Sequence, residues 1–153
     1  MFGLGLQVLV VGAVALSFAT ACREDEVDTD PARVVEAFVD RMRAVHGDPE
    51  RGNAALELVS KDVAENLRER AERASAAAGR PVTPAEMLAP SRFSLEFEPV
   101  EYRAEIRGRW SRVLVTGANP QVEIAEVHCY LEGEAWRVVL DLPPLPPIQF
   151  REE

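Results

Sequence analysis

The sequence predicts an α+β domain in which N-terminal helices pack on one face of a curved antiparallel sheet. Two changes along the chain indicate this class. Apolar residues recur at helical spacing from position 31 to about 78, whereas from position 93 apolar and polar residues alternate with the period of a strand. The alternating segments are joined by short turns, which favour antiparallel pairing. Helices that precede strands, rather than alternating with them, are typical of a single α+β unit.

The first two helices are predicted from matching start signals. Asp30-Pro31 opens the first, because Asp caps free backbone N–H groups and Pro tolerates the first helical position. This helix is expected to end at His46-Gly47, where a cation is favoured by the helix dipole. Asp48-Pro49 repeats the signal and predicts a short second helix that includes residues 55–59.

The third helix is predicted from its two ends. Ser60 is expected to cap its start, and Gly79 to terminate it after residue 78. Thr83 and Glu86 have the spacing of a capping box, which predicts a brief turn of helix before Pro90.

The second half of the chain is expected to form strands. The alternating segments are residues 93–97, 102–107, 110–115, 121–131 and 136–142. Gly108, residues 116–120 and residues 132–134 are expected to form the turns. Trp110 and Trp136 are interpreted as core anchors and Cys129 as a buried small hydrophobe.

The first 22 residues predict export. No charged side chain occurs from Met1 to Ala21, and an apolar run that ends in small residues is typical of a secretory signal. The sequence Phe18-Ala19-Thr20-Ala21-Cys22 resembles the lipobox of bacterial lipoproteins, in which the cysteine thiol receives a diacylglyceryl group before the signal is removed. The resemblance implies a signal peptide over residues 1–21 and lipidation at Cys22.

Two other readings of this segment stay open: an uncleaved transmembrane anchor, and an ordinary signal that leaves a free cysteine. All three place the rest of the chain outside the cytoplasm. The lipoprotein reading implies a bacterial envelope protein held in the membrane through its lipid. In lipoproteins of enteric bacteria, an Asp after the lipidated cysteine tends to retain the protein at the inner membrane. Arg23 stands there in this chain, so we expect the outer membrane, with the domain facing the periplasm.

The remaining chain divides into a tether, one domain and a tail. Residues 22–30 hold the acylated cysteine and five carboxylates, which repel one another and suit a solvated spacer; a Ca²⁺ site is the alternative, although the run lacks the glycine turn and final glutamate of an EF-hand loop. Residues 31–144 are expected to form the domain. Residues 145–153 form a Pro-rich tail, which should leave the sheet in an extended conformation. It would either dock a partner or, as Leu145, Ile148 and Phe150 favour, seal a sheet edge.

Composition excludes several functions. The formal charge is −9 with 17 basic and 26 acidic residues, which argues against nucleic-acid binding. No phosphate loop or dinucleotide fingerprint occurs, and two histidines with one spare cysteine do not complete a zinc site. We therefore expect neither a cofactor nor a metal.

The segment Glu132-Gly133-Glu134-Ala135-Trp136-Arg137-Val138-Val139-Leu140 resembles the last hairpin of the cone-shaped α+β fold shared by nuclear transport factor two and ketosteroid isomerase. The resemblance covers residues 31–144 in pattern. It implies a cone-like roll with a pocket between the concave face of the sheet and the helices, holding a ligand, an active site or simply core. Proteins with this fold commonly dimerise through the open face of the sheet, so the resemblance implies a dimer of this kind as a further expectation. No catalytic residue of the family finds a matching motif in this chain.

His128, Tyr130 and Asp141 are the candidates for chemistry. His128 and Tyr130 alternate on one face of a strand; if that face lines the cone, an imidazole and a phenol converge there, and Asp141 could join them in general acid–base work. The alternative is that they lie on a solvated sheet face. The function expected is a non-enzymatic module that binds a partner protein or a small ligand. An envelope enzyme is the alternative, and a homodimer is a third reading.

Overall fold

The first helix begins at the cap residues that the sequence indicates. In the computed structural model α1 spans Pro31–Ala44, and the Asp30 carboxylate accepts a hydrogen bond of 2.9 Å from the N–H of Ala32. The structure describes residues 29–45, 51–88, 94–145 and 147. The expected helix end at His46-Gly47 and the start signal at residues 48–49 lie outside them, and α1 ends slightly earlier than predicted, with Val45 as its C-cap.

The second and third helices follow closely. α2 spans Arg51–Leu56 and α3 spans Lys61–Ala78. The prediction that the second helix includes residues 55–59 is wrong at its end, because Val59 forms a bridge with Val138 of the sheet instead of continuing the helix. The Ser60 hydroxyl accepts from the N–H of Val63 at 3.3 Å, and Gly79 ends α3 in the left-handed region at φ +65°. Both predicted ends of the third helix are confirmed. They could be predicted because each depends on a cap only a few residues away.

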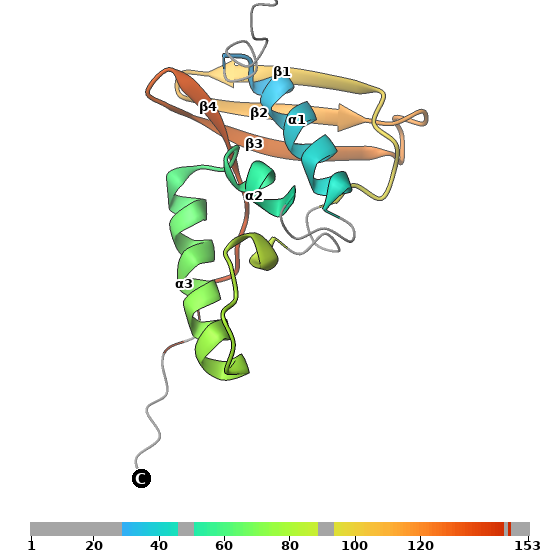
Figure 1. Ribbon diagram of the computed structural model, residues 1–153. Helices are drawn as coiled ribbons and strands as arrows, with labels where there is room; N and C mark the ends of the chain where they lie inside the picture. The colour runs from blue at the N-terminus through green and yellow to red at the C-terminus, as the bar shows by residue number, and fades with distance from the viewer. Residues whose placement is uncertain (1–28, 46–50, 89–93, 146, 148–153) are drawn as a thin grey trace, which may run out of the picture.

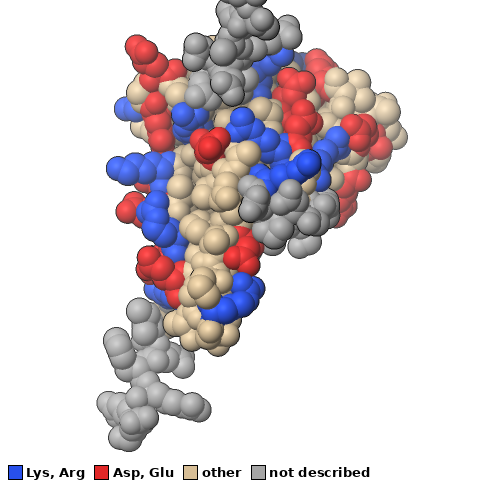
Figure 2. Space-filling view, viewed as in Figure 1, with Lys and Arg blue, Asp and Glu red and all other residues tan. Residues whose placement is uncertain are grey.

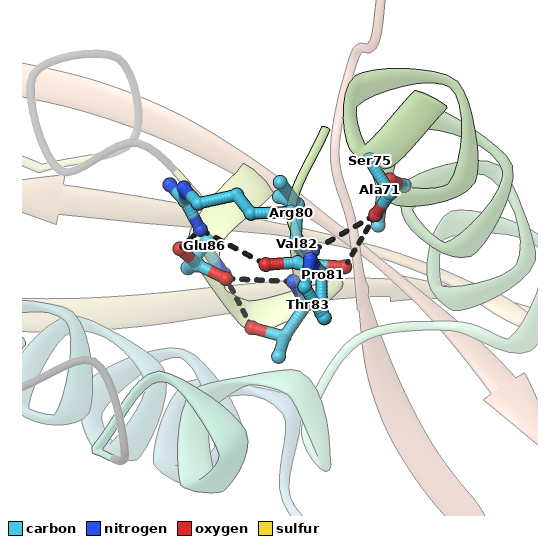
Figure 3. Close-up of polar contacts among 7 residues, drawn as sticks. All are labelled: Ala71, Ser75, Arg80, Pro81, Val82, Thr83 and Glu86. Carbon is cyan, nitrogen blue, oxygen red and sulfur yellow. Dashed lines mark hydrogen bonds and ion pairs between the residues drawn. The ribbon is translucent and has the colours of Figure 1, made fainter. Parts of the chain in front are cut away.

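The turn after α3 is held by side chains that bond to the backbone (Figure 3). The Ser75 hydroxyl accepts from the N–H of Val82 at 2.8 Å. Thr83 and Glu86 form the predicted capping box, with Thr83 N donating to Glu86 at 2.7 Å and Glu86 N donating to the Thr83 hydroxyl at 3.3 Å. The bond from Thr83 and the ion pair with Arg80 lower the pKa of Glu86. The 3₁₀ turn η1 follows at Ala85–Met87.

The sheet is a four-stranded antiparallel meander with the order β1-β2-β3-β4. Its strands are β1 Glu101–Arg107, β2 Trp110–Thr116, β3 Ile124–Glu132 and β4 Ala135–Val139. Gly108 and Gly133 occupy the predicted turns with φ of +63° and +64°, a conformation that glycine adopts without steric cost. The helices and this sheet form one α+β domain, as the sequence predicts.

Three strand predictions need correction. The described residues 94–97 form no strand, because Arg43 of α1 donates to the carbonyl of Phe97 at 3.0 Å and pairs with Glu98 at 2.7 Å, so this backbone is bound to a helix. β3 begins at Ile124 rather than at position 121, because residues 120–122 form a turn in which the Asn119 carbonyl accepts two N–H groups. The last strand ends at Val139, before the prolines.

Helix α1 covers one face of the sheet (Figure 1), whereas the sequence predicted that the N-terminal helices would cover it together. α1 lies across β1, β2 and β4, whereas α3 extends away from the sheet and packs on η1. Buried side chains fill the space between α1 and the sheet: Val34, Val35, Phe38, Met42, Val113, Val115, Cys129, Trp136 and Val138. The burial of Cys129 and Trp136 confirms two core predictions. Within the described residues, no helix is long and apolar enough to cross a bilayer.

The free edge of β4 is closed by residues that precede α3. Val138 donates to the carbonyl of Leu58 and accepts from the N–H of Ser60, both at 2.8 Å. The tail of residues 145–153 was expected to seal an edge or dock a partner; the segment that leads into it runs beside α3, where Arg70 donates to the carbonyl of Pro143 (Figure 1). Ile148 and Phe150, which favoured that expectation, lie outside the described residues.

Candidate functional site

The face of the sheet opposite α1 carries mainly exposed side chains. The strand register aligns them in rows: Glu105, Arg112, His128 and Val139 lie in one row, and Arg107, Trp110, Tyr130 and Arg137 in the next. Since successive strand residues point to opposite faces, Val113 and Cys129 point towards the helices and these rows point away from them. This face is the surface on which the candidate residues gather.

The charged side chains of the first row pair with one another and with Glu126 of β3. Arg112 pairs with Glu105 at 2.6 Å and with Glu126 at 3.5 Å, and His128 Nε2 lies 3.2 Å from Glu126. The hydrogen bond from Arg112 lowers the pKa of Glu105, and that bond raises the pKa of Arg112. A hollow of about 260 Å³ lies over this row. Arg112 and both glutamates are thus already paired within the protein.

An aromatic pair lies next to this row. The rings of Trp110 and Tyr130 are 4.8 Å apart and tilted by 54°, and the guanidinium of Arg109 lies 4.9 Å from the centre of the Tyr130 ring. Trp110 is 53% exposed, so its interpretation as a core anchor is wrong. The reason is the alternation of side chains along β2: Ser111 and Val113 point into the core, so Trp110 points to the opposite face.

A groove of about 530 Å³ begins at this aromatic pair and runs along the start of α3; we name it the Trp110 groove. Three separate parts of the chain line it: the start of α3, the adjoining ends of β2 and β3, and the segment that leaves β4. The lining residues are Ser60, Asp62, Val63, Asn66, Trp110, Tyr130, Glu132, Val139, Leu140, Asp141 and Leu142. It therefore presents aromatic and aliphatic carbon beside three carboxylates.

The structure brings together two of the three candidate residues. Tyr130 and Asp141 line the Trp110 groove, whereas His128 lies outside it and over the smaller hollow. The condition for the three residues to converge, that the His128 face lines a pocket under the helices, is not met, because the His128 side chain is 55% exposed on the opposite face. The alternative, a solvated sheet face, describes His128.

Cys129 behaves as the sequence indicates. It lies in the core between the sheet and the helices and is fully buried, on the face opposite to His128. Burial raises the pKa of its thiol to about 12. A buried, protonated thiol is a poor nucleophile, so Cys129 is a packing residue.

Sequence reasoning missed Trp110, Asp62 and Glu132 as site residues. Asp62 lies in the first turn of α3, where an acidic residue is favoured by the helix dipole, so its presence required no functional explanation. Glu132 lies next to a turn, and its carboxylate accepts from the N–H of Lys61 at 2.9 Å. The aromatic pair could have been found from the alternation of side chains along the two strands, because pairing of residues 110–116 with 124–130 places Trp110 opposite Tyr130 on one face.

The described residues contain no group of three or more His, Cys, Asp or Glu side chains placed to hold a metal ion. The three carboxylates of the Trp110 groove therefore line one groove without forming a coordination sphere. Of the acidic run, the other candidate for a cation, the structure describes only Asp30, whose carboxylate caps α1. The other four carboxylates, Cys22 and His46 lie outside the described residues.

Comparison with known proteins identifies no relative. No protein-family profile, no curated protein and no solved structure matches this chain. The function is therefore inferred from the chemistry of the residues themselves.

Proposed function

We propose that this protein is a lipid-anchored bacterial envelope protein whose domain is a non-enzymatic binding module, with the Trp110 groove as its binding site. The observation that carries the proposal is the groove itself. It is large enough for a small ligand and combines apolar surface with a few polar groups, which is the usual composition of a binding site. It is also open at the surface, beside a half-exposed tryptophan.

Binding is favoured over catalysis by the position of His128. General acid–base work requires a group that titrates near the working pH within reach of the ligand. The imidazole of His128 lies 3.2 Å from Glu126 and does not line the groove. The phenol of Tyr130 and the carboxylate of Asp141 stay in the groove, where they are suited to hold a ligand.

The lipid anchor is proposed from the lipobox-like segment and the cysteine at its end. Each buried methylene contributes about 0.8 kcal/mol, and two acyl chains anchor a protein stably where one holds it only marginally. The tether of residues 22–30 spans at most about 30 Å when extended, so the domain would work close to the membrane surface. We place it at the outer membrane facing the periplasm, and we propose the cone-like roll as the wider fold.

Mass spectrometry of the native protein tests the anchor. The mature chain should begin at Cys22 and carry the mass of a diacylglyceryl group. The variant Cys22→Ala should keep residues 1–21 and carry no lipid. Thiol titration adds an independent readout, because Cys129 is buried and the thiol of Cys22 would be occupied. We expect no reactive thiol in the folded protein and one after denaturation. A chain that still begins at Met1, or a terminal thiol free of lipid, would contradict the anchor.

A further inference from the structure

Among the residues that the structure describes, the charged side chains lining the Trp110 groove all have one sign. They are the carboxylates of Asp62, Glu132 and Asp141, with no Lys, Arg or His beside them in this lining. The exposed surface of the domain elsewhere mixes both signs, as Figure 2 shows for the face that carries the helices. Arg109 and Arg70 border the groove, at the Tyr130 ring and at the side chain of Asn66, but the charges of the lining itself are negative and disfavour an anionic ligand.

The three carboxylates differ in how far the protein already uses them. Glu132 is fixed by the backbone N–H of Lys61 at 2.9 Å. The carboxylates of Asp62 and Asp141 form neither a hydrogen bond nor an ion pair with any residue that the structure describes. Two carboxylates of the groove are thus available to a ligand.

The aromatic part of the groove is also suited to a positive charge. The face of an aromatic ring attracts a cation within about 6 Å of its centre. Arg109 already occupies the ring of Tyr130 at 4.9 Å, which leaves the half-exposed Trp110 as the accessible aromatic surface. Val139 and Leu142 add aliphatic surface that a purely polar ion would not use.

We propose that the Trp110 groove binds a small organic cation: an ammonium group attached to an apolar body. The ammonium would lie against Asp62 and Asp141, and the apolar body against Trp110, Val139 and Leu142. An inorganic metal ion fits less well, because within the described residues these carboxylates do not form a metal-ligating group. This inference rests on the proposed binding role of the groove and adds the class of ligand.

Three compounds with the same phenylpropyl body test the role of charge. They are 3-phenylpropylammonium, 3-phenylpropanol and 3-phenylpropanoate, titrated into the purified full chain by calorimetry and by tryptophan fluorescence. Trp110 reports on the groove, whereas Trp136 is 5% exposed and should stay silent. We expect the ammonium to bind at least fivefold more tightly than the alcohol, and the carboxylate to bind most weakly. Salt should weaken binding of the ammonium and leave that of the alcohol unchanged.

The variant Asp62→Asn/Asp141→Asn removes both available charges. It should lower the affinity for the ammonium to that for the alcohol, with each single variant losing about two- to fivefold. Glu72→Gln removes one charge from an exposed position of α3 that does not line the groove, and it should leave binding unchanged. Trp110→Phe should abolish the fluorescence response and weaken all three compounds.

Three results would overturn the inference. Equal binding of the ammonium and the alcohol would leave the groove as a binding site but remove its preference for cations. Absence of binding by all three compounds would remove the groove as a binding site for this class of ligand, and a cation preference that survives in Asp62→Asn/Asp141→Asn would place the cation elsewhere. If the double variant fails to fold by circular dichroism, the two single variants decide. The lipid anchor is judged separately, by the mass of the chain at Cys22.

Discussion

The two tryptophans provide a direct test of which sheet face is covered. A tryptophan side chain buries at most about 250 Å², and at 25 cal/mol per Å² its full burial corresponds to an upper bound of about 6 kcal/mol. Trp136 is 5% exposed and comes close to full burial, whereas Trp110 is 53% exposed and buries a little under half of its surface. The corresponding bound for Trp110 is about 3 kcal/mol. Compact unfolded chains and the remaining Cβ lower both values.

We therefore expect Trp136→Ala to lower the free energy of unfolding by about 3–5 kcal/mol and Trp110→Ala by about 1–2 kcal/mol. Urea unfolding followed by circular dichroism measures both, provided that the slopes against urea agree among the variants. The less disruptive Trp110→Phe serves as a control for the ring pair with Tyr130. Equal losses in the two alanine variants would mean that Trp110 is buried, and the open sheet face and its groove would have to be abandoned.

Three further predictions concern single residues. Asp30→Ala should lower the free energy of unfolding by about 1 kcal/mol, because it removes the cap of α1, and Asp30→Asn should retain most of it; equal losses in urea unfolding would show that the cap is not formed. Burial raises the pKa of Cys129 from 9.0 to about 12, so the stability that the protonated thiol contributes is complete below pH 9 and is lost as the pH rises towards 12. In this range Cys129→Ala should make the free energy of unfolding fall less steeply with pH, by up to about 1.4 kcal/mol per pH unit. An unchanged pH dependence would contradict a buried thiol. Burial, with the nearby carboxylate of Asp40, raises the pKa of Tyr102 to about 12, so absorbance titration should show a phenol that ionises near pH 12 and disappears in Tyr102→Phe.

Local signals determined the helices and the turns. Asp30, Ser60 and the Thr83–Glu86 pair each satisfy backbone groups two or three residues away, so the sequence alone contains the whole interaction. The same holds for Gly108 and Gly133, whose positive φ depends on the turn itself. The order of helices and then strands, and hence the α+β class, followed from these local patterns.

The site depended on contacts between distant segments. Period-2 alternation separates Trp110 and Arg112 from Ser111 and Val113, but it does not say which set is buried. In the structure the serine and the valine are buried, and this leaves the aromatic pair outside. The edge of β4 is closed by residues 58–60, more than seventy positions earlier in the chain, rather than by the adjacent tail. The Trp110 groove likewise requires α3, β2, β3 and the end of β4 to meet. Caps and turns are short-range interactions that the sequence determined by itself, whereas the covered face and the groove were decided by the tertiary structure, because burial is a property of segments packed together.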